Sequence, residues 1–429
     1  MAETVFTYAA PALKFGRGAV REVGYDVAQL LAAADRGSRR VLVVTDPGVA
    51  AAGHAETVRA SLDSAGLTAE VFDRVRVEPT DDSLVEAVEH ARSEGPWDAV
   101  VAVGGGSSID TGKAVALMVT NPGELMDYIN APVGKAQAPS QPLLPLVAVP
   151  TTTGTGSEST TICVLDVLSL KVKTGISHAA LRPKLAVVDP DLTASQPSGV
   201  TASAGMDILC HALESYTARS YAAFDAKSPE QRVPYCGANP IADMWSERAM
   251  GLLAGAFRRS VRDGSDTVAR EEMAMAATFA GLGFGNAGVH IPHANAYPIA
   301  GRVSSYVAPD YPAEHGPIVP HGMAVSLTAP EAFRFTFDAT PERHLRAAHL
   351  LDPSAVSGED GPDLLPRVLT SLMRDLALPN GLAEVGYGES DVDVLVDGAL
   401  KQQRLLATAP KDVTGEDLAG VIRGSLEHW

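Results

Sequence analysis

The first 190 residues alternate short β-branched runs with amphipathic stretches, and this alternation limits the possible folds more than any other feature of the chain. Segments with helical periodicity, such as residues 54–66 and 81–95, separate the runs. Strands that alternate with helices indicate a parallel sheet in an α/β domain. In such a sheet, ligands bind at the carboxyl ends of the strands. The predicted strands cover residues 39–46, 98–106, 145–152 and 185–190.

Beyond residue 195 the pattern changes to long segments rich in alanine, leucine and methionine. We expect a boundary within residues 189–202, which divides the chain into an α/β domain over residues 1–195 and an all-helical domain over residues 196–429. Residues 220–240 are expected to form a loop-like insertion between helices. The expected helices cover residues 203–219, 240–262, 268–284, 364–376, 391–406 and 415–427.

The charge and the cysteine content exclude several classes of function. The formal net charge is −18 without any block of lysine or arginine, which argues against nucleic acid or an anionic membrane as a partner. No apolar stretch reaches the roughly 18 uncharged residues of a membrane span. Three cysteines without a CxxC pair fit a reducing compartment and exclude a cysteine-based zinc or iron–sulfur site. Because the first residues show no signal or transit pattern, we expect a cytoplasmic location.

Two polar loops that follow predicted strands suit a phosphate-bearing ligand. Residues 104–117, GGGSSIDTGKAVAL, open a helix, where glycines allow close approach and free N–H groups favour an anion. The alternative is a simple strand-to-helix turn in which Ser107 caps the helix. The second loop, PTTTGTGSES at residues 150–159, carries hydroxyls that suit a pyrophosphate or a ribose. The glycine loop at residues 104–117 does not follow the G-x-G-x-x-G fingerprint.

Asp46 ends the first predicted strand and has two interpretations. A carboxylate at this place could accept a hydrogen bond from the 2′-hydroxyl of an adenosine ribose, which favours NAD over NADP. It could equally cap the helix that follows the strand. The residue alone does not decide between them.

The helical half carries residues that suit a metal ion. Asp207 and His211 are four residues apart and share one face of a predicted helix, although such a pair alone is more often a surface ion pair. One carboxylate and three imidazoles suit Fe(II), Zn(II) or Co(II). Four of the eleven histidines lie within a short later stretch: His290, His293, His315 and His321.

Together these motifs resemble the iron-containing, or group III, alcohol dehydrogenase family along nearly the whole chain. They are GGGSSIDTGK, PTTTGTGSE, the Asp-x3-His of residues 207–211, a histidine in the 290s and PHG at residues 320–322. Further segments, such as RVEPTDDSLVEA, GFGNAGVHIPH and VPHGMAVSLTAPEAF, are similar to the hydroxyacid–oxoacid transhydrogenase branch. The resemblance implies a dinucleotide-binding α/β domain followed by an all-helical metal-binding domain, an architecture shared with dehydroquinate synthase.

The resemblance also implies roles for individual residues of the helical half. Many family members carry a further histidine four residues after the third ligand, and Tyr297 takes that position here, where a proton-transfer role is expected. His290 matches no ligand position; it is a catalytic candidate if it faces the pocket and a packing residue otherwise. Pro292 is expected to kink or restart its helix. The implied ligands of iron, or of zinc in its place, are Asp207, His211, His293 and His321.

For NAD, the resemblance places Asp46 on the ribose and the glycine loop at the pyrophosphate. Lys173 matches a family lysine that contacts the nucleotide ribose and is also a candidate for proton transfer. Lys113 is either a solvated helix lysine or a site residue. The residues implied at the pyrophosphate are Gly104, Gly105, Gly106 and Ser107, and those near the nucleotide are Asp110, Thr151 and Thr152.

The implied activity is hydride transfer through bound NAD from a hydroxyacid, such as 4-hydroxybutyrate, to an oxoacid, such as 2-oxoglutarate. Both substrates carry carboxylates, and Arg302 and His315 are the basic candidates to pair with them. The alternative is an iron-dependent alcohol dehydrogenase that uses free NAD(H) and small primary alcohols or aldehydes. A homodimer is expected from the family.

Two other classes share this architecture or descend from it. A cyclising lyase of the dehydroquinate synthase type should gather lysines and arginines around a phosphorylated substrate, and the sequence shows no such cluster. A non-catalytic descendant should have lost ligands or the glycine loop, and both are present. We therefore expect an enzyme.

Overall fold

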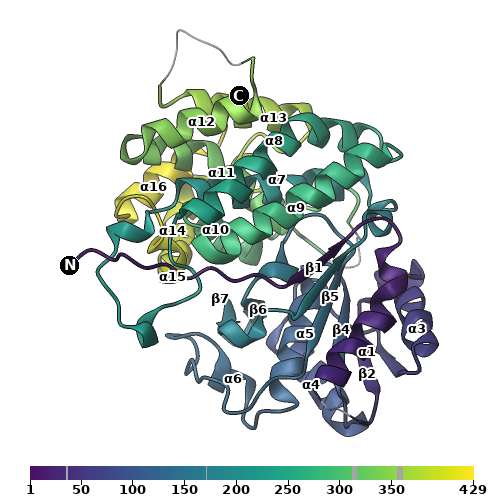
Figure 1. The fold of residues 1–429 in the computed structure, drawn as a ribbon. Coiled ribbons are helices and arrows are strands. Elements are labelled where there is room, and N and C mark those ends of the chain that lie inside the picture. Colours follow the sequence, from purple (N-terminus) through teal and green to yellow (C-terminus); the bar gives the residue numbers. More distant parts are fainter. Residues whose placement is uncertain (35–36, 171, 312–315, 355–360) are drawn as a thin grey trace. The chain divides into compact units, whose positions relative to one another are not determined.

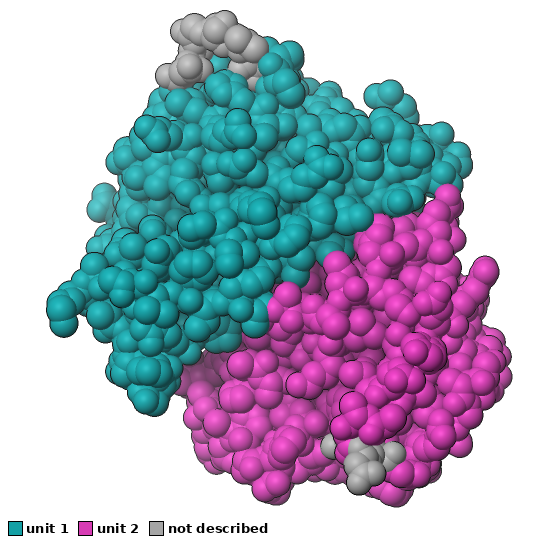
Figure 2. All heavy atoms as spheres, in the orientation of Figure 1, with its two compact units in different colours: residues 1–9, 153–155, 195–429 teal, residues 10–152, 156–194 magenta. Residues whose placement is uncertain are grey.

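The computed structural model describes residues 1–34, 37–170, 172–311, 316–354 and 361–429, which form two compact units (Figure 2). The sheet unit comprises residues 10–152 and 156–194, and the helical unit comprises residues 1–9, 153–155 and 195–429. The first residues belong to the helical unit because they pair with its insertion: Glu3 Oε2 accepts from the Lys227 N–H at 2.9 Å. The expected domain limits of 1–195 and 196–429 stay a prediction.

The sheet unit is built on six parallel strands in the order β1-β8-β5-β4-β2-β3 (Figure 1). This arrangement confirms the predicted parallel sheet. An antiparallel hairpin, β6–β7, forms a second, two-stranded sheet. The strands are β1 Ala12–Phe15, β2 Arg40–Val44, β3 Thr68–Phe72, β4 Ala99–Gly104, β5 Leu146–Pro150, β6 Ile162–Val167, β7 Val172–Ser177 and β8 Leu185–Val188.

Helices cover both faces of this sheet, so that its central strands are buried on both sides. Val41 and Val43 of β2 belong to a core with α1 and α3, whereas Leu42 and Val44 belong to a second core with α4 and α5. Burial on both faces explains why these strands read as continuous β-branched runs. The helices are α1 Val23–Ala33, α2 Pro47–Ala51, α3 His54–Ser64, α4 Asp81–Glu94, α5 Gly106–Met118 and α6 Leu125–Tyr128.

The strand order reverses direction between β2 and β4, which are neighbours in the sheet. From β2 the chain continues to β3 on one side, and it returns to β4 on the other side. Loops at such a switch point diverge and leave a crevice at the carboxyl ends of the two strands. Asp46 is the second residue after β2, and Gly105 joins the last residue of β4, Gly104, to the first residue of α5, Gly106.

The helical unit packs around the long helix α7 (Figure 1). The side chains of α7 are buried on nearly all sides. The expected helix over 391–406 is two helices, because the chain turns at Lys401–Gln402. None of the helices in the described part of the chain has the length and apolar character needed to cross a bilayer. The helices are α7 Ser198–Thr217, α8 Pro240–Arg262, α9 Thr267–Ala287, α10 Ile291–Arg302, α11 His321–Thr336, α12 Pro341–Leu351, α13 Leu364–Asp375, α14 Val392–Leu400, α15 Gln403–Leu406 and α16 Gly415–Gly424.

Candidate active site

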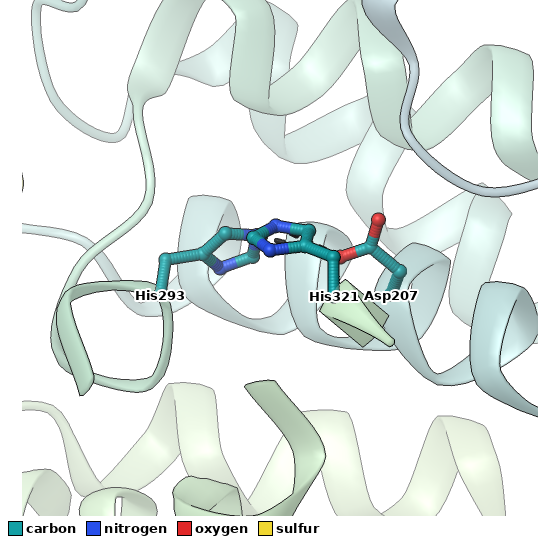
Figure 3. Close-up of side chains that lie close together, drawn as sticks. All are labelled: Asp207, His293 and His321. Atoms are coloured by element: carbon teal, nitrogen blue, oxygen red, sulfur yellow. Dashed lines mark ion pairs between the residues drawn. The ribbon is translucent and has the colours of Figure 1, made fainter. Parts of the chain in front are cut away.

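Three helices of the helical unit direct polar side chains at one buried carboxylate. Asp207 Oδ1, from α7, lies 3.5 Å from His293 Nε2 on α10 and 3.9 Å from His321 Nε2 on α11 (Figure 3). His211 Nε2, one turn further along α7, is 3.7 Å from the same oxygen. The structure therefore brings together four side chains from separate parts of the sequence.

The local sequence explains this convergence. A Cβ atom at Gly322 would lie 2.1 Å from the carbonyl oxygen of Ser203, so only glycine lets α11 approach the backbone of α7 this closely. The close approach brings His321, the first residue of α11, beside Asp207. Pro292 lies in the first turn of α10, where a missing N–H is tolerated, so the expected restart of the helix occurs at Ile291.

The donor set fits a divalent cation. Asp207 Oδ1 and His293 Nε2 are buried, and neither has a hydrogen-bond partner within the described part of the chain. Burying such atoms without a partner is costly, and a cation between them would satisfy both. The ligand atoms of Asp207, His293 and His321 all lie within 4.8 Å of one another; His211 lies outside this group. Its ring is held by stacking on Phe284, with centroids 3.8 Å apart.

The surroundings prepare these groups to bind a positive charge. Burial raises the pKa of Asp207, but the neighbouring imidazoles outweigh burial and hold it below its usual range, so the carboxylate is ionised. Burial lowers the pKa of His211 to about 3, which keeps this imidazole neutral. Burial also lowers the pKa of His293, but the charges of Glu214 and Asp207 outweigh it and raise this pKa to about 9.

Two further predicted residues lie on or next to α10. His290 is fully buried; its Nε2 is 3.1 Å from Thr217 Oγ1 and its ring edge faces Phe333, a placement that favours the packing interpretation. Tyr297 follows His293 by one turn, and its ring centroid is 6.2 Å from that of His321. Arg302 is exposed at the end of α10, and His315 lies outside the described residues.

In the sheet unit, the Asp46 carboxylate accepts hydrogen bonds from residues that follow both strands of the switch point, β2 and β4. Its Oδ1 accepts from the Val49 N–H at 3.0 Å and so caps α2, as one interpretation expected, while its Oδ2 accepts from Ser108 Oγ at 3.1 Å. Gly104 has a φ of +149°, and a Cβ there would lie 2.3 Å from Ser108 Oγ. Gly105, rather than Ser107, is the N-cap of α5.

The remaining loop residues lie at the carboxyl ends of β4 and β5. Ser107 Oγ accepts from the Glu78 N–H at 3.1 Å. The Thr151 N–H donates to the Gly104 carbonyl at 3.0 Å, and Thr152 Oγ1 is 3.2 Å from the place of a Cβ on Gly105. These contacts bring the glycine backbone, the hydroxyls and the start of α5 together at the carboxyl ends of β4 and β5, a combination that can bind a phosphate group.

Asp110 and Lys113 form a buried cluster with Ser157 and do not project from the carboxyl ends of the strands. Lys113 is fully buried and is therefore not the solvated lysine that one interpretation expected. Its Nζ donates to Asp110 Oδ1 at 3.1 Å and to Ser157 Oγ at 2.6 Å. The other oxygen of Asp110 accepts from the Val164 N–H at 2.9 Å. The cluster ties α5 to the segment that leads into the β6–β7 hairpin.

Lys173 lies on β7 with its ammonium group buried between two carboxylates. Nζ contacts Glu78 and lies 3.1 Å from Asp166 Oδ2. Burial lowers the pKa of Lys173, but the two carboxylates outweigh it and raise this pKa above its ordinary value. Lys173 is therefore a fixed positive charge beside Glu78. The backbone N–H of Glu78 in turn donates to Ser107 Oγ, next to the glycines.

Sequence reasoning does not find Glu214, which touches the site directly. Its carboxylate is fully buried, and Oε1 lies 2.5 Å from His293 Nδ1. The available signal is its position three residues after His211, which places both on adjoining parts of one helix face. A glutamate at that spacing is common on any helix, so the signal is weak.

Comparison with known proteins agrees with this geometry. The model of the family "Iron-containing alcohol dehydrogenase" matches residues 10–190, and that of the "Fe-containing alcohol dehydrogenase family, C-terminal" matches residues 230–426. Mitochondrial hydroxyacid–oxoacid transhydrogenase of Bos taurus is 43% identical over 99% of this chain and 90% of the relative; the Homo sapiens protein is 42% identical over the same shares. A crystal structure of 1,3-propanediol oxidoreductase has a TM-score of 0.84 at 30% identity, covering 98% of this chain and 100% of that chain.

The fold and these matches define an oxidoreductase with an α/β part and a helical part. The chain belongs to the iron-containing alcohol dehydrogenase family. Membership implies iron and a nicotinamide dinucleotide as cofactors, and it confirms the predicted fold class and the prediction of an enzyme.

The relatives also correct one expectation. Both transhydrogenases are named mitochondrial, which contradicts the cytoplasmic location expected from the first residues. Residues 1–9 pair with the insertion of the helical unit and serve the fold. Targeting depends on separate segments that do not shape the folded enzyme, so the pattern of these residues is a poor guide to location.

Proposed function

We propose that the protein is a hydroxyacid–oxoacid transhydrogenase. A hydroxyacid such as 4-hydroxybutyrate would lose a hydride and its hydroxyl proton and leave as succinic semialdehyde; a bound nicotinamide dinucleotide would carry the hydride, and groups of the protein would take the proton. An oxoacid such as 2-oxoglutarate then takes the hydride and a proton and leaves as 2-hydroxyglutarate. The observation that carries this choice is the 43% identity to a transhydrogenase along nearly the whole chain, against 30% for the diol oxidoreductase.

We place the metal ion among the predicted ligands of the helical unit. The buried, unpartnered atoms Asp207 Oδ1 and His293 Nε2 support this placement. Iron is the family expectation, and zinc suits the same donors. When bound, such an ion supplies a Lewis acid that polarises the oxygen of the substrate. The proposed ligands are Asp207, His211, His293 and His321.

The protein's own groups then handle the proton. Tyr297 lies beside His321 on the side of α10 that carries His293, which supports the proposal that its hydroxyl receives the substrate proton and passes it on. Lys173, held by Glu78 and Asp166, is the second proposed participant: as a fixed positive charge it would bind the nucleotide ribose, whose hydroxyls could pass the proton on. His290 is proposed to support α10 by packing.

The dinucleotide is proposed to bind at the switch point of the sheet unit. The pyrophosphate would lie against Gly104, Gly105, Gly106 and Ser107, where the first N–H groups of α5 favour negative charge. The adenosine ribose would lie beside Asp46, which follows β2, while Thr151 and Thr152 follow β5 on the other side of β4. The resemblance also implied Asp110 near the nucleotide; it would support the site indirectly, by holding α5 in place through its contact with Lys113.

One assay separates the transhydrogenase from a dehydrogenase. Iron-loaded protein without added nucleotide is given 4-hydroxybutyrate and 2-oxoglutarate, and 2-hydroxyglutarate is measured by mass spectrometry. Several turnovers per chain are expected, since the bound dinucleotide is reduced and reoxidised in place. Product that requires free NAD, with accumulation of NADH, would instead identify an NAD-dependent alcohol dehydrogenase. The similarity to 1,3-propanediol oxidoreductase makes this dehydrogenase the second candidate.

We also propose a homodimer. Strand β1 is one of the two outer strands of the six-stranded sheet, and among the described residues it pairs only with β8; an edge of this kind could pair with a second copy. Light scattering coupled to gel filtration should give twice the mass of the chain. A monomer at micromolar concentration would contradict the proposal.

A further inference from the structure

Glu214 is a buried acid whose side-chain hydrogen bonds, within the described part of the chain, all go to α10 and its N-cap residue. It belongs to α7 and is fully buried. Its Oε1 lies 2.5 Å from His293 Nδ1, and its Oε2 accepts from the His290 N–H at 2.6 Å and from the His293 N–H at 3.4 Å. The carboxylate therefore contacts both the backbone and the side chain of the segment that carries one proposed ligand.

These contacts replace the usual cap of a helix. The first N–H groups of a helix lack partners within it. In α10 the N-cap residue, His290, forms no side-chain cap, and Pro292 has no N–H. Glu214 supplies the missing acceptor from another helix, and its negative charge also suits the positive end of the α10 dipole. The start of α10 is thus fixed to α7 by one carboxylate.

The same carboxylate sets the orientation of the His293 ring. An ionised carboxylate only accepts hydrogen bonds, so Nδ1 keeps its proton, and Nε2 is the nitrogen that would give up its proton and offer a lone pair to an ion. Nε2 is the atom that lies 3.5 Å from Asp207 Oδ1. By contrast, His211 Nδ1 has no hydrogen-bond partner among the described residues, and its ring is held by Phe284. His293 is therefore the proposed ligand that receives support from an anion.

We propose that Glu214 is a positioning residue of the metal centre, which holds His293 with Nε2 directed at the ion and places a negative charge behind its ring. This inference rests on the metal site proposed above. A carboxylate behind a ligand histidine fixes its tautomer and raises its basicity, and losing such a partner lowers metal affinity by about 10- to 100-fold. The effect requires His293, because among the described residues the hydrogen bonds of this carboxylate reach the site through His293 and the backbone beside it.

The test compares two identical substitutions. Glu214→Gln removes the charge behind His293. The control Glu247→Gln also removes a carboxylate beside α7: it accepts a hydrogen bond at 2.7 Å from Oη of Tyr216, the residue two positions after Glu214. Co(II) affinity is measured by competition with a chelator, and the visible spectrum of bound Co(II) reports the ligand field. We expect about 10- to 100-fold weaker binding and an altered spectrum for Glu214→Gln alone. Unchanged affinity and spectrum would overturn the proposal.

A double-mutant cycle shows whether Glu214 acts through His293. In a His293→Ala background, Glu214→Gln should cause no further loss of Co(II) affinity. An equal loss in both backgrounds would overturn the proposal and leave a structural cap only. If Glu214→Gln folds poorly by circular dichroism, Glu214→Asp, which keeps the charge but withdraws it, is read by the same two measurements. Failure of the unaltered protein to bind Co(II) would instead refute the proposed metal site itself.

Discussion

Replacing Lys113 with methionine should destabilise the sheet unit, because this lysine is the cation of a buried cluster. Methionine has a similar length but carries no charge and donates no hydrogen bond. The substitution leaves the Asp110 carboxylate buried with two donors, Ser157 Oγ at 2.5 Å and the Val164 N–H at 2.9 Å. It also removes the donor to the Ile162 carbonyl, which Lys113 Nζ reaches at 2.6 Å.

The magnitude follows from the burial of both partners. Removing one member of a buried ion pair costs about 3–5 kcal/mol, because the other charge stays in the interior without compensation. With a urea m-value of about 1–3 kcal/mol/M, the unfolding midpoint should fall by at least about 1 M. Adding Asp110→Asn to Lys113→Met removes the second charge, so the double variant should recover part of this loss. The matched control is Lys135→Met: Lys135 is 76% exposed and pairs with Asp127 at 2.7 Å.

The assay follows the sheet unit by itself. Trp97 is buried in this unit, whereas Trp245 and Trp429 belong to the helical unit and can be replaced by phenylalanine. The fluorescence of Trp97 then reports urea unfolding of the sheet unit. Lys135→Met should change the free energy of unfolding by no more than about 0.5 kcal/mol. A Lys113→Met midpoint equal to that of this control would refute the reasoning. No recovery in the double variant would show that Lys113 stabilises the unit mainly through its neutral partners.

Three further predictions follow from single positions. Burial raises the pKa of Glu158 from its ordinary 4.5 to about 7, so the folded protein holds this proton more tightly than the unfolded chain. The free energy of unfolding should therefore fall by up to about 3 kcal/mol as the pH rises from about 5 to about 8. Urea titrations at these two pH values should show this fall in the unaltered protein and not in Glu158→Gln. An equal fall in both proteins would contradict the assignment. Gly104→Ala forces a Cβ to within 2.3 Å of Ser108 Oγ at a positive φ, and a cost of about 1–3 kcal/mol should appear as a lower melting temperature, with weaker NAD binding by calorimetry. Tyr297→Phe should lower turnover about 100-fold or more and change the pH–rate profile; an unchanged profile would reduce this residue to packing.

The fold class could be predicted because the interior strands carry their own signal. Strands β2, β4, β5 and β8 are buried on both faces, and each therefore reads as a continuous apolar run. Strands β1 and β3 lie at the two edges of the sheet, where exposed and half-buried residues leave no such run. The edges could be located only by the pairing itself, which the sequence does not contain.

The proposed ligands could be predicted through the family resemblance and partly from a local pattern, while their supporting groups could not be predicted. Asp207 and His211 share a helix face at a spacing that one sequence window displays. Glu214 and His293 are 79 residues apart, and Lys113 and Ser157 are 44 residues apart, so their pairing depends on how elements pack. A buried charge needs a partner, but the sequence does not say which distant residue provides it.

The placement of Glu214 explains why one helix can organise the whole proposed centre. Asp207, His211 and Glu214 follow one another on α7 at spacings of four and three residues, so they share one face. Rotation of α7 would therefore move two proposed ligands and the support of a third together. Gly322 fixes the position of α11 against the same helix, since no side chain fits between the backbones there. Because α7 is buried on nearly all sides, its register is determined by the packing of the entire helical unit, and the geometry of the site is a property of that packing.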